Sequence, residues 1–273
     1  MLKGLGDTNG RALGFEVEFP DEMPQTLAQD EEWCIVREGN ETREVRFHNY
    51  HEVYQTPGLY EHLFCRKLEC NSPSVVASLL EAAVKDSDED SSGLSVLDLG
   101  AGNGMMGQEL RNLGVKSIVG VDIIPEAAQA AERDRPGVYS NYYVVDLAEP
   151  GEEVREELQE QNFNCLTTVA ALGFGDIPPR VFAEAFNLVT TPGWLAFNIK
   201  EVFLRENDES GFNRLISGLV ADERLEFVSR QRYRHRLSVS GNPLYYTAFV
   251  ARKHGDIPAA WVEDGLASEV SAI

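Results

Sequence analysis

The segment of residues 95–104, SVLDLGAGNG, constrains the fold of this chain more than any other. Its first five residues form an apolar run interrupted only by Asp98, which is typical of a strand buried on both faces of a parallel sheet. Three glycines follow, and helical spacing resumes at Met105. A glycine-rich turn between a strand and a helix leaves backbone N–H groups free and lets a ligand approach closely. The segment therefore predicts a binding loop.

Two later strands also end in aspartate. Residues 117–122 read SIVGVD and residues 141–146 read NYYVVD. Asp122 and Asp146 are therefore the last residues of apolar runs, and Asp98 is the last but one of its own run. Asp122 follows the glycine loop by about 20 residues, the spacing at which a βαβ unit places a carboxylate beside the ribose of a nucleoside. We expect the three carboxylates to line one edge of a parallel sheet.

With these acids in place, the chain resembles the class I S-adenosylmethionine-dependent methyltransferases. The resemblance extends more weakly over about residues 50–253 and is carried by DLGAGNG at 98–104, VGVDI at 119–123 and VVDL at 144–147. It implies an α/β fold: a three-layer Rossmann-like sandwich whose mostly parallel, seven-stranded sheet ends in an antiparallel hairpin. It also implies S-adenosylmethionine as the cofactor. Two further runs, at 167–178 and 196–201, look like those of a bacterial-type group of small methyltransferases of unsettled substrate.

The resemblance assigns the methionine part of the donor to the loop. Asp98 would face its ammonium group, the backbone carbonyl of Ala170 would hold its amino group, and the glycines would cradle it at Gly100, Gly102 and Gly104. The alternative for the glycines is an ordinary strand-to-helix turn.

The adenosine part of the donor would be bound by the next two strand ends. Asp122 would bind the ribose, Ile123 would pack on the adenine, Asp146 would accept a hydrogen bond from the adenine amino group, and Leu147 would offer its backbone N–H. Both carboxylates could instead be helix caps or loop residues, and Ile123 could be core.

An aromatic segment precedes the first strand of this unit. In the resembled family such a segment often folds over the donor, and we expect Tyr54 to contact it; half-buried packing is the alternative for this residue and for Tyr50 and Tyr60. A general base, if one is needed, could be one of three histidines in the same region, His48, His51 and His62. No catalytic residue is assigned, because the sulfonium donor is already activated.

The main alternative is a nicotinamide-dependent oxidoreductase. Residues 102–107 also fit Gly-x-Gly-x-x-Gly, and Asp122 would suit the ribose of NAD. Asp98 argues against NAD because a carboxylate there would face a pyrophosphate, whereas the ammonium of a methionine moiety would attract it. A catalytically silent S-adenosylmethionine-binding regulatory module is the second alternative.

The composition of the chain limits the kinds of molecule and surface that it can bind. With 24 basic and 45 acidic side chains the formal charge is −21, so a nucleic acid would be repelled. We expect a small-molecule acceptor, with a protein acceptor as the less favoured alternative. No apolar run reaches the roughly 18 residues of a membrane helix, and the N-terminus lacks a signal-peptide pattern, so we expect a cytoplasmic protein without a membrane partner. The sequence makes no prediction about oligomeric state. We expect free thiols and no metal site from Cys34, Cys65, Cys70 and Cys165.

The chain divides into three predicted parts. Residues 1–71 would form an N-terminal extension, 72–254 the methyltransferase domain, and 255–273 a tail. Within the extension we expect loosely ordered structure to about residue 30, then a hairpin and a lid-like helical segment. Ser72 is the predicted cap of the helix that follows it.

Two polar patterns lie outside these motifs. Arg230, Arg232, Arg234 and Arg236 alternate along a predicted strand and would share one face, where they would protect an edge from aggregation. The alternative is that they contact an acidic substrate or a partner. Lys200 and Glu201 follow a strand end on the rim that carries the glycine loop and could face a substrate.

Overall fold

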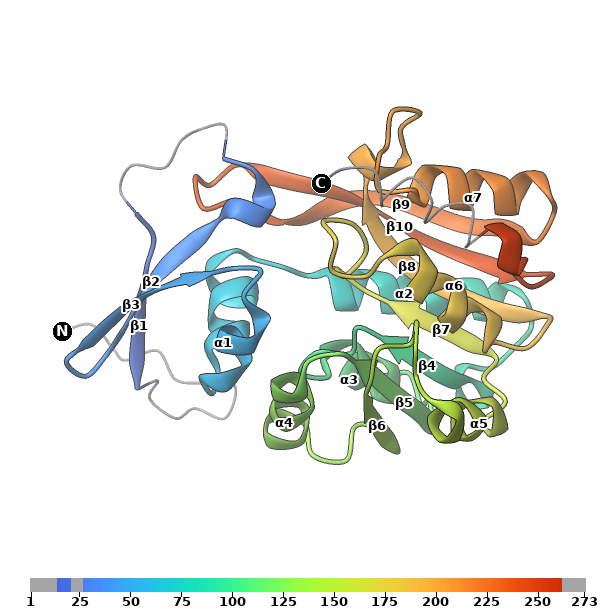
Figure 1. Cartoon of the computed structure of the whole chain (residues 1–273), viewed down its shortest axis with the longest axis horizontal. Coiled ribbons are helices and arrows are strands. Elements are labelled where there is room, and N and C mark those ends of the chain that lie inside the picture. Colours follow the sequence, from blue (N-terminus) through green and yellow to red (C-terminus); the bar gives the residue numbers. More distant parts are fainter. Residues whose placement is uncertain (1–13, 21–26, 262–273) are drawn as a thin grey trace.

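Two β-sheets organise the computed structural model, which describes residues 14–20 and 27–261. A three-stranded sheet has the order β1-β2-β3, and a seven-stranded sheet has the order β6-β5-β4-β7-β8-β10-β9. Figure 1 shows the small sheet at one end of the molecule and the large sheet at the other, with α1 between them.

The element bounds follow the predicted alternation of strands and helices. The strands are β1 Phe15–Glu18, β2 Trp33–Glu38, β3 Glu41–Arg46, β4 Ser95–Leu99, β5 Ser117–Asp122, β6 Asn141–Val144, β7 Cys165–Thr168, β8 Gly193–Lys200, β9 Leu225–Leu237 and β10 Pro243–Lys253. The α-helices are α1 Tyr50–Gln55, α2 Ser72–Asp86, α3 Met105–Asn112, α4 Pro125–Asp134, α5 Glu152–Glu160, α6 Pro179–Asn187 and α7 Phe212–Ala221. The shorter helical turns are η1 Gln29–Glu31, η2 Glu61–Lys67, η3 Ser91–Gly93 and η4 Glu201–Leu204, of which η2 is a π-helix.

The large sheet has the predicted three-layer arrangement. Strands β4 to β8 pair in parallel, and β10 pairs antiparallel with both β8 and β9. Side chains alternate between two cores: Trp194 and Ala196 of β8 pack with α2 and α3, whereas Leu195 and Phe197 pack with α6 and α7. The sheet ends in the antiparallel pair of β9 and β10, which a short turn connects, and this ending confirms the expected fold.

The start of the chain is more ordered than predicted. Phe15 and Val17 are buried and β1 pairs antiparallel with β2, so the expectation of loose structure to about residue 30 is wrong for this strand and for η1. The alternating FEVE pattern is the signal, and it is short. Residues 1–13, 21–26 and 262–273, including most of the predicted tail, lie outside the described residues. The predicted hairpin is present as β2 and β3.

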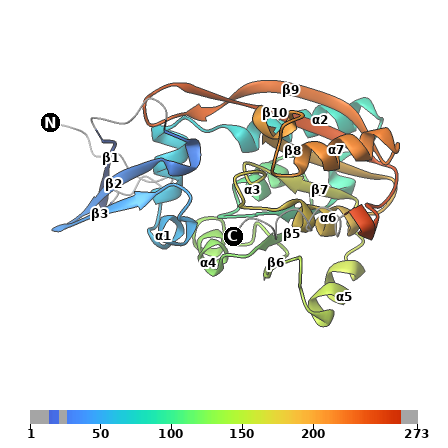
Figure 2. The same ribbon diagram turned by 45° about the horizontal axis from the view of Figure 1, so that its top comes forward.

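A buried ion pair ties the small sheet to the large one. Glu32 Oε2 accepts a hydrogen bond from Arg236 at 2.6 Å, and Glu32 Oε1 accepts one from the backbone of Val239. Both side chains of the pair are almost fully buried. Figures 1 and 2 show why: β9 and β10 extend beyond the other strands, and their turn reaches the small sheet.

The burial of Arg236 shows that the prediction of four arginines on one face of β9 is wrong. The pairing of β9 with β10 shifts register between Leu244 and Tyr245, and this bulge turns Arg236 inward. Arg230, Arg232 and Arg234 stay exposed, as expected for an edge strand.

Ser72 is not a cap. Asn71 occupies the N-cap position of α2, and the Ser72 hydroxyl instead lies 2.6 Å from Nδ1 of the buried His235. The described helices include none long and apolar enough to cross a bilayer.

Candidate functional site

A cavity of about 430 Å³ opens at the carboxyl ends of the parallel strands. Its floor comes from the residues at or just after the ends of β4, β5, β6 and β7, among them Leu99, Val121, Val145 and Val169. Open α/β sheets bind ligands at this edge, where successive strands are followed by helices on opposite faces. The size lies within the usual range for small-molecule sites.

The glycine loop forms one wall through backbone conformations that other residues avoid. Gly100 and Gly102 have φ values of 67° and 53°. A Cβ atom on Gly102 would lie 2.5 Å from the Tyr54 hydroxyl oxygen, and one on Gly100 would lie 2.9 Å from Ile177. The glycines therefore leave room for the groups above the loop. Gly104, also at positive φ, precedes α3 and faces Val138 rather than the cavity.

Asp122 joins this loop to the end of β5. Its Oδ2 accepts a hydrogen bond from the backbone N–H of Gly102 at 2.9 Å, and its Oδ1 accepts one from Ile124 at 3.0 Å. Burial raises the pKa of Asp122, and the backbone donors oppose that shift. Each carboxylate oxygen has a second lone pair, so these bonds leave capacity for a ligand hydroxyl group.

Asp98 lies deeper and faces a smaller recess of about 40 Å³ that shares Gly100, Tyr54 and Ala170 with the main cavity. Its oxygens accept hydrogen bonds from Thr167 Oγ1 at 2.6 Å and from the Tyr139 hydroxyl at 2.7 Å. Burial raises the pKa of Asp98 to about 6, despite these two donors.

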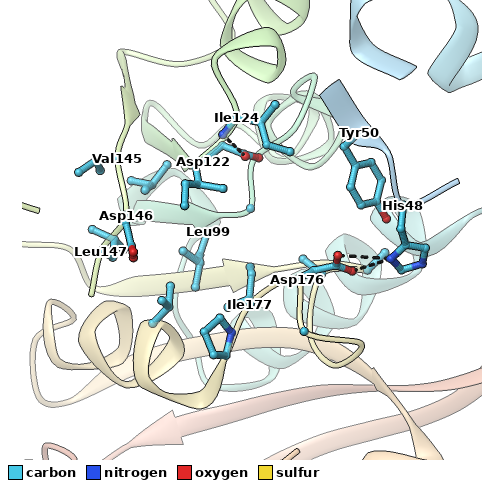
Figure 3. Close-up of a pocket in the computed structure, with 18 of the residues that line it drawn as sticks. His48, Tyr50, Leu99, Asp122, Ile124, Val145, Asp146, Leu147, Asp176 and Ile177 are labelled. Atoms are coloured by element: carbon cyan, nitrogen blue, oxygen red, sulfur yellow. Dashed lines mark hydrogen bonds and ion pairs between the residues drawn. The ribbon is translucent and has the colours of Figure 1, made fainter. Parts of the chain in front are cut away.

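The ends of β5 and β6 supply another part of the cavity lining. Ile123 and Leu147 both line the cavity, Ile123 being 60% exposed and Leu147 buried. The Asp146 side chain is exposed and accepts a hydrogen bond from the backbone of Ala148 at 2.8 Å. Figure 3 shows Asp146 and Leu147 on one side, with Asp122 and Ile124 above them.

Ala170 is held by a buried polar chain that the sequence did not suggest. Ala170 has a φ of 58°, and its N–H donates to Asn198 Oδ1 at 2.6 Å. Asn198 in turn donates to the Tyr233 hydroxyl, which donates to Ser72 Oγ at 2.7 Å. The available signal was an asparagine inside the otherwise apolar run of β8. A satisfied network of this kind fixes one local geometry.

Stacked tyrosines form the roof. The rings of Tyr50 and Tyr54 lie 6.0 Å apart at 24°, and those of Tyr54 and Tyr60 lie 5.1 Å apart at 22°. All three line the cavity. Burial raises the pKa of Tyr50 and Tyr54 well above the ordinary value, so both hydroxyl groups stay protonated.

The histidines divide into three environments. His48 and His51 both line the cavity, whereas His62 packs against Phe15 and does not. His48 Nδ1 lies 3.1 Å from Asp176 Oδ2, a residue that the sequence analysis missed. Its signal was the loop GFGD after β7, where two glycines allow a sharp turn. His51 Nδ1 lies 2.9 Å from Glu126 Oε2 and is mostly exposed.

Lys200 and Glu201 do not line the main cavity. The Lys200 ammonium lies over the Phe174 ring, and Glu201 forms an ion pair with Arg232. The four cysteines are unpaired, and the described part of the chain holds no group of three or more His, Cys, Asp or Glu side chains that could bind a metal ion.

Three acids at or near strand ends, a glycine loop and a ligand-sized cavity at the same edge are typical of nucleotide-binding α/β proteins. Residues 90–209 match the family described as a methyltransferase domain. The chain therefore carries a class I S-adenosylmethionine-dependent methyltransferase domain. The match selects this interpretation over the nicotinamide-dependent alternative.

Solved structures with partial similarity include a Thermoplasma acidophilum protein, at 20% identity and a TM-score of 0.48, covering 67% of this chain and 86% of that one. A magnesium protoporphyrin IX methyltransferase from Synechocystis, solved with bound S-adenosylmethionine, has 17% identity and a TM-score of 0.45, covering 66% and 79%. A ribosomal protein L11 methylase from Lactobacillus delbrueckii has 17% identity and a TM-score of 0.42, covering 67% and 79%. These similarities carry no information about the acceptor. No curated protein matches the chain.

Asp98 makes stability depend on pH in a defined direction. Its pKa rises from 3.8 to about 6 on folding, so the folded protein holds the proton more tightly than the unfolded chain does. The contribution of Asp98 to the free energy of unfolding is therefore complete below about pH 4. It is lost as pH rises through about 6, and the loss amounts to up to about 3 kcal/mol. Asp98→Asn removes this loss. We expect urea unfolding of both proteins near pH 4 and near pH 7 to show this difference. The free energy of unfolding of Asp98→Asn, relative to that of wild type, should be higher near pH 7 than near pH 4. Parallel pH dependences would contradict the assignment.

Proposed function

We propose that this methyltransferase acts on a small-molecule acceptor by in-line displacement. The observation that supports this most is the roof: Tyr50, Tyr54 and Tyr60 cover the cavity from a segment outside the sheet, and a polymer would have to displace that segment. The formal charge of −21 also disfavours nucleic acid. When bound, the donor supplies an activated methyl group on a sulfonium, so the protein's main task is to align the reactants and exclude water.

The adenosine part of the donor would lie along the strand-end side of the cavity. Asp122 would accept hydrogen bonds from the ribose hydroxyls, and Ile123 would pack on the adenine. Asp146 would accept a hydrogen bond from the adenine amino group beside the backbone N–H of Leu147. The free lone pairs of Asp122 and the exposure of Ile123 support these roles.

The methionine part of the donor would lie between Asp98, the glycine loop and Ala170. Gly100 and Gly102 give it access, and Gly104 acts indirectly by starting α3. The recess beside Asp98 has a volume of only about 40 Å³, which is smaller than an amino-acid moiety. We infer that the Tyr54 ring, whose hydroxyl lies directly over Gly102, turns aside on binding and then covers the donor.

Each of the three predicted parts of the chain would have its own role in this function. Residues 1–71 would act as a cap that carries the tyrosine roof, residues 72–254 as the donor-binding domain, and residues 255–273 as a tail. We place the enzyme in the cytoplasm, where its donor and small-molecule acceptors are made.

The acceptor class can be tested directly. Incubation with methyl-labelled S-adenosylmethionine and separate cell fractions should transfer label to dialysable metabolites, because only small molecules fit under the roof. RNA and protein fractions should stay unlabelled. Label confined to RNA or protein would overturn the small-molecule proposal while leaving methyl transfer intact.

Asn198 tests the placement of the methionine part. Asn198→Ala frees the Ala170 backbone and should weaken binding of S-adenosylhomocysteine by about tenfold, or about 1.4 kcal/mol. Binding of methylthioadenosine, which lacks the amino-acid end, should change less than about twofold. Asn187→Ala is the matched control, because Asn187 also uses its side-chain amide to fix backbone groups, at Ile257. Equal weakening of both ligands, measured by calorimetry, would reduce Asn198 to a structural residue.

A further inference from the structure

The wall opposite the predicted adenine site has its own chemistry. Figure 3 shows His48, Tyr50 and Asp176 together on one side of the cavity, with Asp146 and Leu147 on the other side. His48 comes from the segment between β3 and α1, and Asp176 comes from the loop after β7. The wall is therefore assembled by the N-terminal extension and the methyltransferase domain together.

The loop that carries Asp176 is held in an unusual shape. Gly173, Phe174 and Gly175 all have positive φ, at 91°, 53° and 83°. A Cβ atom on Gly173 would lie 2.2 Å from the Phe203 ring, so the loop packs tightly against its support. Phe174 pays a steric cost for its φ that an ordinary surface turn would avoid. Backbone outliers of this kind gather at functional sites.

The shape of the loop places Asp176 against His48. Asp176 lies within 3.1 to 3.3 Å of His48 Nδ1, and the Phe174 ring meets the imidazole edge to face with centroids 5.6 Å apart. The imidazole is about four-fifths buried at its side chain. A carboxylate on Nδ1 orients the ring and fixes the tautomer that leaves Nε2 able to accept a proton. No residue in the described ranges hydrogen-bonds to Nε2.

Other cavity groups suit proton removal less well. The tyrosine hydroxyls of the roof stay protonated, because burial raises their pKa. Asp98 is already bonded to two hydroxyl groups, and Lys200 lies outside the main cavity. The pair of His51 with Glu126 has the same chemistry, but the His51 side chain is 61% exposed against 19% for His48.

A narrow recess continues beyond this wall. It shares His48, Tyr50 and Asp176 with the main cavity, has a volume of about 30 Å³, and ends on Gln29 and Tyr246. The buried Gln29 Oε1 has no hydrogen-bond partner in the described part of the chain. A space of this size holds about one water-sized group, so a polar substituent that donates a hydrogen bond would satisfy Gln29.

We propose that the wall of His48, Tyr50 and Asp176, together with the recess that Phe174 also lines, is the methyl-acceptor site, and that the His48–Asp176 pair is the general base for an acceptor hydroxyl or ammonium group. A hydroxyl acceptor gives its proton to His48 Nε2 as its oxygen lone pair bonds to the methyl carbon, whereas an ammonium acceptor gives up its proton to Nε2 first and then attacks with the freed nitrogen lone pair. In either case the carbon–sulfur bond breaks with its electron pair staying on sulfur, and the proton passes from His48 to water. Tyr50 and Phe174 flank the acceptor, and Asp176 is a positioning residue. The proposal rests on the methyl-transfer function above and specifies its substrate class.

The test combines binding, transfer and product chemistry. Wild type, His48→Ala, Asp176→Asn and a control, His254→Ala, are titrated with S-adenosylhomocysteine, then given labelled S-adenosylmethionine and a metabolite extract. His254 is a matched control because its imidazole also pairs with a carboxylate, that of Glu226, but lies outside the cavity. All four should bind S-adenosylhomocysteine within about twofold, because the pair lies outside the donor contacts. His48→Ala should lose about 100-fold or more in transfer rate, the range of general-base catalysis, and His254→Ala should change less than about twofold. Asp176→Asn should fall between them.

Two further readouts separate proton removal from mere support. Added imidazole should restore part of the transfer rate of His48→Ala, and mass spectrometry should find the label in a methyl ether or an N-methyl group. Full activity of His48→Ala, failure of imidazole rescue, or a methyl ester product, whose carboxylate precursor needs no base, would overturn the proposal. A wild-type protein that binds S-adenosylhomocysteine but labels nothing would also overturn it, whereas failure to bind would refute the donor site itself.

Discussion

The hydrogen bond from the Gly102 backbone to the Asp122 carboxylate is the contact on which the site depends. It joins the glycine loop after β4 to the end of β5, so two adjacent strand ends act as one rigid support. The loop can adopt this shape only because Gly100 and Gly102 tolerate positive φ. The remaining lone pairs of Asp122 then face a cavity whose floor the buried strands have already fixed.

The N-terminal extension turns this open edge into an enclosed site. Its small sheet is tied to β9 by the buried pair of Glu32 and Arg236, and α1 lays its tyrosines over the cavity. An ion pair taken out of water stabilises little in net terms, but a partner left alone there would cost several kcal/mol. The pair therefore specifies where the extension docks, and with it the position of His48 opposite the strand-end acids.

The sequence predicted those parts of the molecule that follow from local patterns. Buried strands, helical periodicity and the spacing of Asp98, Asp122 and Asp146 are visible in one dimension, so the sheet and the strand-end acids could be placed before any coordinates. Asp176, Asn198 and Glu32 could not be, because their roles depend on contacts with residues distant in the chain. Arg236 was misplaced for a related reason: a single bulge in β9 reverses the side-chain alternation on which the prediction depended.

We propose that Asp122 and the glycine loop it holds form the donor site. Calorimetry of S-adenosylhomocysteine with Asp122→Ala measures this most directly, with Asp208→Ala as control because Asp208 also accepts backbone hydrogen bonds, from Ser210 and Asn213, at the start of α7. Affinity should fall by more than about tenfold for Asp122→Ala, or about 1.4 kcal/mol, and should stay within about twofold for Asp208→Ala. Unchanged affinity in a folded Asp122→Ala protein would contradict this proposal.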